Sequence, residues 1–319
     1  MKALVYTGVE TLKYQDAANP APSAGDALVR VESVGICGSD MHAFLGHDER
    51  RPAPLILGHE GAGVTSDGRR VTINPLVTDP NSAASLSGRE NLDPGRQIIS
   101  MPPREGAFAE YVTIPERNLV EVPDDVSLDK AALAEPMAVS WHAARLGIRA
   151  LHEADHGRAH VIGGGAIGLA AALSLKAMGV DNVTLAEPNG ARAAYLRDHC
   201  GITIDNDPDG APLIVDAVGY AATRAAASAL ATPGGVILHI GLGSSDGGIN
   251  IRRLTLQEIT FIGTYTYTAQ DFRDCAAAMW DGKLGPLDWV ETRALSEGGQ
   301  AFEDIRSGVV AAPKIILKP

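Results

Sequence analysis

The sequence predicts an α/β protein, with a β-rich first third followed by an inserted, doubly wound parallel sheet. Early segments such as Lys2–Tyr6, Ala27–Val34 and Ala109–Ile114 carry β-branched residues between Gly, Pro and Asp, which indicates short strands. After Leu128, Ala-rich segments of helical length alternate with short apolar runs, an order typical of βαβ units. The expected parallel strands are His160–Ile162, Val183–Ala186, Leu213–Asp216, Val236–Ile240 and Ile259–Ile262.

The last part of the chain is expected to return to the first domain. It carries a helical pattern at Phe272–Trp280 and ends in the apolar strand Lys314–Leu317. We therefore predict a β domain over residues 1–136, a nucleotide-type α/β domain over residues 137–270, and a return segment over residues 271–319.

Composition limits the partners that we expect. The net charge of −12 disfavours nucleic acid, because phosphate binding requires a basic surface. Three cysteines do not make a disulfide framework, which favours a reducing, cytoplasmic setting. The first residues lack an apolar signal core, and the longest uncharged stretch, Val161–Leu175, is too short to cross a bilayer. We therefore expect a small-molecule substrate, with neither nucleic acid nor membrane as a partner.

A glycine-rich loop follows the first predicted parallel strand. Gly163, Gly165 and Gly168 form the spacing G-x-G-x-x-G between an apolar strand and an apolar helix. Glu187 lies 19 positions after Gly168, at the end of the next strand, where a carboxylate accepts hydrogen bonds from an adenosine ribose. Its charge would repel a 2′-phosphate, which favours NAD over NADP, although the nearby Arg192 weakens this preference. The alternative is a glycine turn in another α/β fold.

Three separate motifs hold side chains that suit a metal. Cys37 is followed 22 residues later by His59, and Glu135 comes much further along the chain. A thiolate, an imidazole and a carboxylate suit zinc, and three protein ligands with one open position are typical of a catalytic site. Each residue alone also has an ordinary interpretation, because a single Cys is often a buried small hydrophobe and a single His is often a hydrogen-bonded core residue.

Taken together, these motifs resemble those of the zinc-containing medium-chain alcohol dehydrogenases, nearest the sorbitol, threonine and sugar-alcohol-phosphate branch. The resemblance rests on Gly35-Ile-Cys-Gly-Ser-Asp40, Gly58-His-Glu-Gly61, Glu135-Pro136 and the glycine loop placed after them. It implies a GroES-like β-barrel catalytic domain and a Rossmann coenzyme domain. It also implies homo-oligomers, dimers or tetramers.

The resemblance assigns zinc ligands by position. Cys37, His59 and Glu135 would bind the catalytic zinc, and Glu60 would be a fourth or alternating ligand. Because an oxygen ligand donates less charge than a second thiolate, Glu135 would leave the metal more strongly Lewis acidic.

The resemblance also assigns residues around the metal. Asp40 would orient His59, Ser39 would take the hydroxyl proton, and His42 would stand at the far end of a proton relay. The alternative for Ser39 and His42 is that they only cap the helix that follows Cys37.

The expected coenzyme contacts extend beyond the glycine loop. The segment Phe261–Tyr267 would lie near the nicotinamide by resemblance, or would simply be an edge strand. The full set of predicted cofactor-binding residues is Gly163, Gly165, Ala166, Ile167, Gly168, Glu187, Arg192, Val218, Gly241, Thr264 and Tyr265.

One motif of the family is missing. Many relatives hold a structural zinc with four cysteines, and here the matching spacing carries Asp79, Ser82, Ser85 and Asp93. Serine hydroxyls are poor zinc ligands and two carboxylates alone bind zinc weakly. We therefore expect one catalytic zinc per chain and no structural zinc.

The implied reaction is hydride transfer between a secondary alcohol and NAD, with zinc polarising the substrate oxygen. Polar residues at His47, Arg50, Arg51 and Glu110 favour a polyol or sugar derivative, unless they are ordinary solvated groups. Two other functions remain open. One is a zinc-free quinone or enoyl reductase of the same superfamily, which would lack the metal ligands. The other is a nucleotide-binding protein without catalysis.

Overall fold

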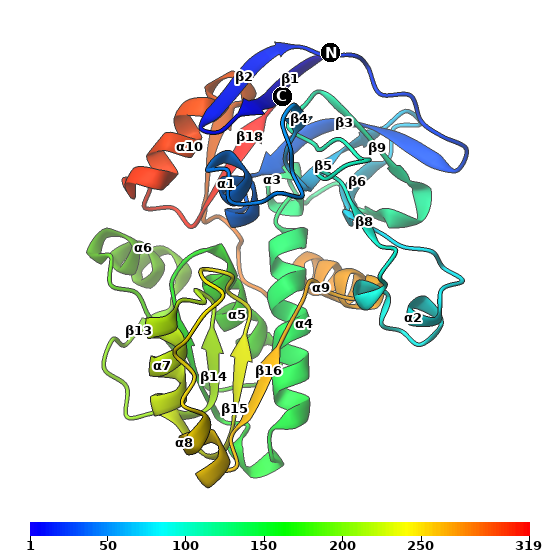
Figure 1. Cartoon of the computed structure of the whole chain (residues 1–319). Helices are drawn as coiled ribbons and strands as arrows, with labels where there is room; N and C mark the ends of the chain where they lie inside the picture. Colours follow the sequence, from blue (N-terminus) through cyan, green and yellow to red (C-terminus); the bar gives the residue numbers. More distant parts are fainter. The chain divides into compact units, whose positions relative to one another are not determined.

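The computed structural model describes residues 1–319, which form two compact units (Figure 1). The first unit contains Met1–Glu135, Thr268–Asp281 and Val290–Pro319, and the second contains Pro136–Tyr267 and Gly282–Trp289. Both chain termini therefore lie in the first unit. The sequence prediction placed residues 282–289 in the return segment, but they belong to the second unit. Their apolar side chains Leu284, Leu287 and Trp289 are buried.

The first unit is built on a seven-stranded sheet in the order β10-β6-β5-β3-β18-β17, with β9 also pairing with β3. The final strand joins the N-terminal ones, because Ile316 pairs with Gly35 in an antiparallel register. The return of the chain end therefore completes this sheet. The strands are β3 (Asp26–Gly35), β5 (Glu60–Thr65), β6 (Arg70–Ile73), β9 (Tyr111–Pro115), β10 (Leu119–Glu121), β17 (Val290–Ala294) and β18 (Lys314–Lys318).

Smaller elements complete the first unit. One sheet has the order β2-β1-β4, and a two-stranded sheet joins β7 to β8. Phe302 of α10 packs against Phe44 of α1 and against Phe108, with ring centroids 5.2 and 6.1 Å apart. The elements are β1 (Lys2–Gly8), β2 (Thr11–Asp16), β4 (Leu55–Ile56), β7 (Leu76–Val77), β8 (Gln97–Ile98), α1 (Gly38–Phe44), α2 (Ala83–Leu86), α3 (Leu128–Ala131), α9 (Ala269–Trp280) and α10 (Gly298–Ser307).

The second unit is a six-stranded sheet in the order β13-β12-β11-β14-β15-β16, and all its pairings are parallel. Successive strands are added outward from β11 in one direction up to β13 and in the other direction from β14, so the point between β11 and β14 is the switch point where doubly wound sheets bind ligands. The elements are β11 (Arg158–Ile162), β12 (Asn182–Ala186), β13 (Thr203–Ile204), β14 (Ala211–Asp216), β15 (Ala231–His239), β16 (Thr260–Gly263), α4 (Ala134–Ala150), α5 (Ala166–Ala177), α6 (Gly190–Cys200), α7 (Ala221–Leu230) and α8 (Ile251–Leu256).

Helices cover both faces of this parallel sheet. Gly147 of α4 lies against Leu213 and Leu238, whereas Ala227 of α7 shares a core cluster with Ile214. Neighbouring residues of a strand point to opposite faces, so these contacts place α4 and α7 on different sides. The strands are buried from both sides, which explains why they appear in the sequence as continuous apolar runs.

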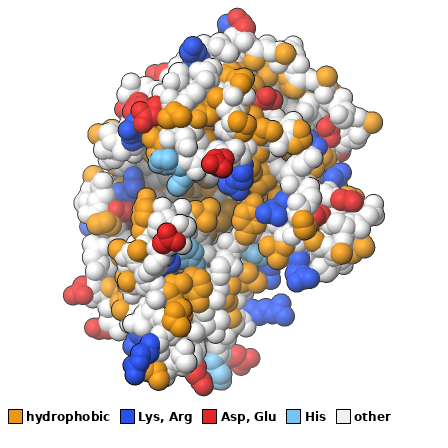
Figure 2. Space-filling model, viewed as in Figure 1, with side chains coloured by type: hydrophobic (Ala, Val, Ile, Leu, Met, Phe, Trp, Pro, Cys, Tyr) orange, Lys and Arg blue, Asp and Glu red, His pale blue; other side chains and the backbone are white.

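Differences from the expected elements are confined to their ends. The strand expected from Ala109 begins at Tyr111, and Ala109 only forms an isolated bridge to Ala3. The helix expected from Phe272 begins at Ala269, because Thr268 and Asp271 form a capping box. No helix is long and apolar enough to cross a membrane. On the face in Figure 2, acidic and basic side chains are scattered among hydrophobic ones.

We predict that Gly168→Ala destabilises the second unit. A Cβ at Gly168 would stand 1.8 Å from the carbonyl oxygen of Gly163, so helix and strand must separate. We expect a loss of about 2 kcal/mol or more, as for other overpacked sites, seen as a lower thermal unfolding midpoint.

Gly165→Ala is the matched control, because a Cβ there meets nothing within 4 Å. It should cost less than about 1 kcal/mol, since Gly165 only caps α5. Equal melting of the two variants would contradict the role of close packing at Gly168.

Candidate active site

The structure brings Cys37, His59 and Glu60 together in the first unit. Their ligand atoms all lie within 4.8 Å of one another. Cys37 follows the end of β3, and Glu60 opens β5, which pairs with β3 so that Gly35 faces Glu60. A Cβ at Gly35 would stand 2.0 Å from Glu60 Oε2, so this position needs glycine. The pairing of two strands thus brings the two sequence motifs into one site.

Asp40 and Ser100 hold the imidazole of His59. Asp40 is fully buried, accepts hydrogen bonds from the backbone N–H groups of Cys37 and Gly58 at 3.0 and 3.1 Å, and has Oδ1 3.5 Å from His59 Nδ1. Ser100 Oγ lies 3.3 Å from the same nitrogen. Because Nδ1 faces these two groups, Nε2 remains for a metal. This agrees with the expected orienting role of Asp40, whereas the part played by Ser100 was not predicted from the sequence.

Charges around His59 favour a cation at this place. Burial alone would lower the pKa of His59, but the negative charges of Asp40 and Cys37 raise it well above its usual value. Burial likewise opposes ionisation of Asp40, yet the contact with His59 lowers the pKa of Asp40. A thiol, an imidazole and carboxylates are also the donors that zinc prefers. The residues present therefore fit a zinc ion.

Lys314 was missed by the sequence analysis and is part of this site. Its ammonium donates to Glu60 Oε1 at 2.6 Å and to the Ile36 carbonyl at 2.8 Å. Burial would lower the pKa of Lys314, but the charges of Glu60 and Cys37 raise it. The other oxygen of Glu60, Oε2, is buried and has no hydrogen-bond partner, so it is the carboxylate atom open to a ligand. The only sequence signal was a lysine at the start of the apolar run Ile315–Leu317.

Glu135 lies near this group but is not one of the three clustered residues. It occupies the first turn of α4, is 7% exposed, and its charge contributes to the raised pKa of Lys314. The carboxylate that the structure places beside Cys37 and His59 is that of Glu60. The assignment of Glu135 as a zinc ligand therefore stays a prediction.

The expected proton relay lies on α1. Ser39 and His42 are three residues apart on this helix, so they share one face, and both are partly exposed. The ring of His42 lies 6.3 Å from that of His47, between centroids. Both side chains of the expected relay thus lie on one partly exposed helix. The relay role itself remains a prediction.

Two of the polar residues proposed to meet the substrate hold the fold instead. The guanidinium of Arg51 is buried, where it donates to Asp48 Oδ2 at 2.5 Å and to the Ser100 carbonyl at 3.1 Å. Glu110 accepts a hydrogen bond from the Lys2 backbone N–H at 2.7 Å.

Hydrogen bonds occupy the lobe that holds a structural zinc in many relatives. Ser82 caps α2 by accepting from the Ser85 backbone N–H at 3.1 Å, and its hydroxyl lies 3.0 Å from that of Ser85. Ser85 Oγ donates to the Asp79 carbonyl at 2.6 Å. A hydrogen bond from Ser82 is the main cause of the lowered pKa of Asp93. The four matching positions thus interact with one another through oxygen atoms.

The glycine loop of the second unit has the geometry that its motif predicts. Gly163 has a φ of +101°, and a Cβ there would stand 2.3 Å from Val218 Cγ2. Gly165 is open, and α5 begins directly after it at Ala166. The helix N-terminus, with Ile167 and Gly168 in its first turn, therefore follows an uncovered backbone segment, which suits a pyrophosphate.

Glu187 lies against the glycine loop. Its carboxylate accepts from the Gly164 backbone N–H at 3.0 Å and from the Asn189 N–H at 2.7 Å. Each oxygen thus holds one donor and keeps a lone pair for a ribose hydroxyl. Arg192 follows in α6, where its backbone N–H donates to the Asn189 side chain at 3.0 Å.

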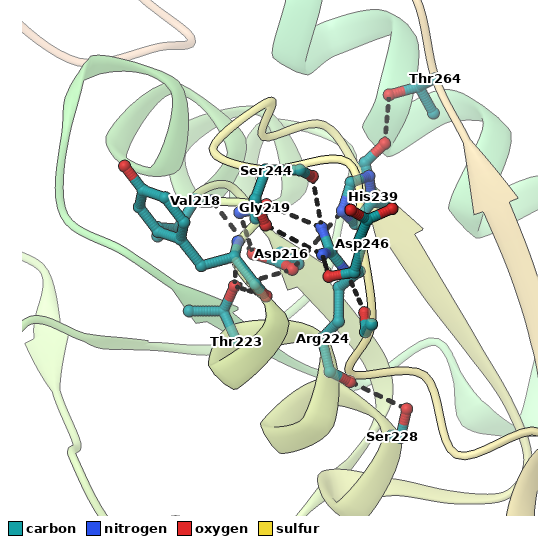
Figure 3. Close-up of polar contacts among 12 residues, drawn as sticks. Asp216, Val218, Gly219, Thr223, Arg224, Ser228, His239, Ser244, Asp246 and Thr264 are labelled. Atoms are coloured by element: carbon teal, nitrogen blue, oxygen red, sulfur yellow. Dashed lines mark hydrogen bonds and ion pairs between the residues drawn. The ribbon is translucent and has the colours of Figure 1, made fainter.

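The other predicted coenzyme residues follow the carboxyl ends of three strands. Val218 comes after β14, Gly241 after β15, and Thr264 and Tyr265 after β16. Thr264 donates to the His239 carbonyl from its backbone N–H at 3.1 Å and from its hydroxyl at 3.4 Å, and Figure 3 shows the hydroxyl contact. Ligands of doubly wound sheets bind at this edge. Of the segment Phe261–Tyr267, residues up to Gly263 belong to edge strand β16, and its place near the nicotinamide stays a prediction.

Comparison with known proteins supports this arrangement. The GroES-like domain of alcohol dehydrogenases matches residues 23–124, and the zinc-binding dehydrogenase domain matches residues 166–281. The chain belongs to the zinc-dependent medium-chain alcohol dehydrogenases. The predicted fold and family are thereby confirmed, and the protein is an oxidoreductase that uses zinc and a nicotinamide dinucleotide.

Individual relatives match along most of the chain. L-galactonate-5-dehydrogenase of Escherichia coli K12 is 28% identical over 309 residues, covering 89% of this chain and 88% of that protein. D-xylulose reductase of Saccharomyces cerevisiae is 26% identical over 312 residues, covering 88% and 86%. A solved E. coli oxidoreductase of unknown specificity has a TM-score of 0.90 at 25% identity and covers 99% of this chain and 98% of its own.

We predict that the purified protein holds one zinc ion per chain. The cluster at Cys37 offers thiolate, imidazole and carboxylate, whereas the lobe at Ser82 offers hydroxyls and carboxylates that bind one another. Elemental analysis should give a ratio near one. A second, tightly held zinc that survives dialysis against a chelator would contradict this expectation.

We predict that Glu135→Ala lowers zinc content and kcat together, by roughly ten-fold or more, as expected if its carboxylate supports the metal. Glu60→Ala should lower kcat more than zinc content if Glu60 is the alternating ligand that the resemblance implies. The control is Glu121→Ala, at an exposed glutamate of β10. If Glu135→Ala keeps full zinc and turnover, Glu135 is a helix-start residue worth only about 1 kcal/mol of stability.

Proposed function

We propose that this protein oxidises a secondary alcohol group of a polyol or sugar acid and transfers the hydride to NAD. The observation that carries this proposal is the cluster of half-buried Cys37 with buried His59 and Glu60, in a chain that also has a doubly wound parallel sheet. The names of its relatives support the substrate class, because D-xylulose reductase and L-galactonate-5-dehydrogenase act on hydroxyl-rich carbon chains.

The residues of the site divide the work. Cys37, His59, Glu60 and Glu135 would hold the zinc, which when bound acts as a Lewis acid toward the substrate oxygen. Asp40 keeps the ring of His59 turned toward the cluster. Lys314 compensates the charge of Glu60 and fixes one of its oxygens, leaving Oε2 to face the metal site.

Proton release falls to residues on α1. The Ser39 hydroxyl accepts the proton that the substrate hydroxyl loses and passes its own proton toward His42. The ring of His42 has His47 as its aromatic neighbour, and His47 is exposed, so the proton reaches water. A proton route of this kind lets the hydride leave carbon without a buried charge remaining behind.

Assembly is a further part of the proposal. We infer a homo-oligomer, a dimer or tetramer, because β16 is an edge strand and the neighbouring helix α8 exposes Ile251 and Leu256 at 66% and 61%. Exposed edges and apolar side chains of this kind favour association with another chain.

The proposed activity is tested with a panel of polyols, sugar acids and simple alcohols, each offered with NAD to the zinc-loaded protein. We expect NADH formation with hydroxyl-rich substrates and its loss in Cys37→Ser, which should also lose zinc. Turnover of quinones or enoyl compounds by metal-free protein would instead favour a zinc-free reductase. Tight NADH binding without any turnover would favour a non-catalytic role.

We predict a higher kcat/KM with NAD than with NADP. Glu187 would accept hydrogen bonds from the ribose hydroxyls and repel a 2′-phosphate. Glu187→Ser removes both effects, so the ratio of kcat/KM for NAD to kcat/KM for NADP should fall by roughly ten-fold or more, which corresponds to about 1.4 kcal/mol or more. Steady-state kinetics with both coenzymes measure this. Equal or better use of NADP by the unaltered protein would refute the assignment.

A further inference from the structure

Two buried charged residues lie at the carboxyl ends of β14 and β15, and neither was singled out by the sequence (Figure 3). Asp216 is the last residue of β14 and is fully buried. Arg224 lies in α7 and is 5% exposed. Together they tie the turn after β14 to the loop after β15.

Asp216 gathers the donors of the first turn. Its Oδ1 accepts from the backbone N–H groups of Val218 and Gly219 at 3.0 and 2.9 Å. Its Oδ2 accepts from the Thr223 hydroxyl at 3.0 Å. The carboxylate therefore fixes the path of the chain from β14 into α7.

Arg224 gathers the acceptors of the second loop. It donates to the carbonyl oxygens of Gly219, Gly247 and Ser244 at 2.7, 2.6 and 2.9 Å, and also to that of Asp246. A further bond reaches Ser244 Oγ at 3.0 Å. All three guanidinium nitrogens thus donate to backbone carbonyls or to the Ser244 hydroxyl. No other side chain offers this many donors on one planar group.

The loop after β15 is rich in glycine and borders a cavity. Residues 241–250 include four glycines, which leave the backbone highly flexible when unconstrained. A cavity of about 340 Å³ lies beside the loop, lined by Ser244, Ser245, Gly247, Ile249, His239, Phe261 and Arg224 itself. The bonds from Arg224 therefore act on a glycine-rich segment that borders this cavity.

The two strand ends approach each other closely. A Cβ on Gly241 would stand 2.1 Å from the carbonyl carbon of Val218, and one on Gly219 would stand 2.1 Å from the carbonyl oxygen of Gly241. The backbone N–H of Ser244 donates to the Gly219 carbonyl at 2.9 Å. A small displacement of the loop would therefore move Val218 and Gly241, two of the predicted coenzyme contacts.

We propose that Arg224 is a positioning residue for the nicotinamide half of the coenzyme. A doubly wound sheet binds one half of a dinucleotide over each set of strands. Glu187, at the end of β12, belongs to the adenosine half, so the ends of β14 and β15 serve the other half. Arg224 holds that second surface in its binding-competent form before the coenzyme arrives. The inference rests on the proposed function.

Binding of two ligands tests the proposal. In Arg224→Met, the Kd for NADH should rise about ten-fold if the loop keeps its competent position only a tenth of the time. The Kd for AMP, which occupies only the adenosine half, should change by less than about two-fold on the same reasoning. Calorimetry of both ligands on the zinc-loaded protein gives these values. Arg224→Lys keeps the charge but loses the planar guanidinium, so its Kd for NADH should lie between those of wild type and Arg224→Met.

Arg253 supplies the matched control. Its guanidinium also bonds backbone carbonyls, those of Ser228 and Ala231 at 2.7 and 3.0 Å, but Ala231 is at the opposite end of β15. Arg253→Met should therefore leave the Kd of NADH unchanged. A rise in the NADH Kd equal to that of Arg224→Met would overturn the proposal.

Hydrogen exchange provides a readout without coenzyme. The backbone N–H of Ser244 should exchange slowly in wild type and in Arg253→Met, and rapidly in Arg224→Met and Arg224→Lys. Unchanged exchange, unchanged NADH binding, or an equal loss of AMP and NADH binding would each overturn the positioning role. If Arg224→Met does not fold, Arg224→Lys carries the same comparisons. Failure of wild type to bind NADH at all would reject the proposed function, while the exchange measurement would still test whether Arg224 holds the loop.

Discussion

The metal centre depends on one buried ion pair, between Lys314 Nζ and Glu60 Oε1 at 2.6 Å. Moving a carboxylate out of water costs several kcal/mol unless a partner offsets the loss of hydration, and Glu60 is fully buried. The lysine stands 254 positions further along the chain. Glu60 therefore has its counter-charge only when the last strand is paired with β3, which couples completion of the sheet to the arrangement of the cluster.

The same constraint explains the order of elements in the first unit. Because β18 must lie beside β3, the parallel sheet is inserted between two parts of one domain and does not follow a finished domain. Gly35 ends β3 where the Glu60 carboxylate needs space, so backbone register and metal ligation are set by the same residue. A larger side chain at Gly35 would separate the strands and move Cys37 away from His59.

The second unit depends on a different device, in which backbone segments approach where no side chain intervenes. Gly168 contacts Gly163 at the end of β11, and Gly241, after β15, contacts Val218, after β14. Glycines permit this approach but do not enforce it, since they leave the chain flexible. Buried charged side chains hold these segments in place, and Arg224 does so through its hydrogen bonds to backbone carbonyls. The predicted coenzyme surface of the second unit thus combines glycines, which allow backbone segments to approach closely, with buried polar side chains, which hold those segments in position.

The sequence by itself determined the fold class, the parallel strands, the glycine loop and the Cys37 and His59 motifs, because these depend on local patterns of apolar residues, glycines and short spacings. The resemblance also proposed Glu60, next to His59, as a further ligand. Tertiary structure decided that Glu60, of the two proposed carboxylates, clusters with Cys37 and His59, that Lys314 pairs with Glu60, and that Arg224 binds the loop after β15. These contacts could not be inferred from the sequence for one physical reason. Each is a contact between segments distant along the chain, and a side chain's local sequence does not state which distant carbonyl or carboxylate it will meet.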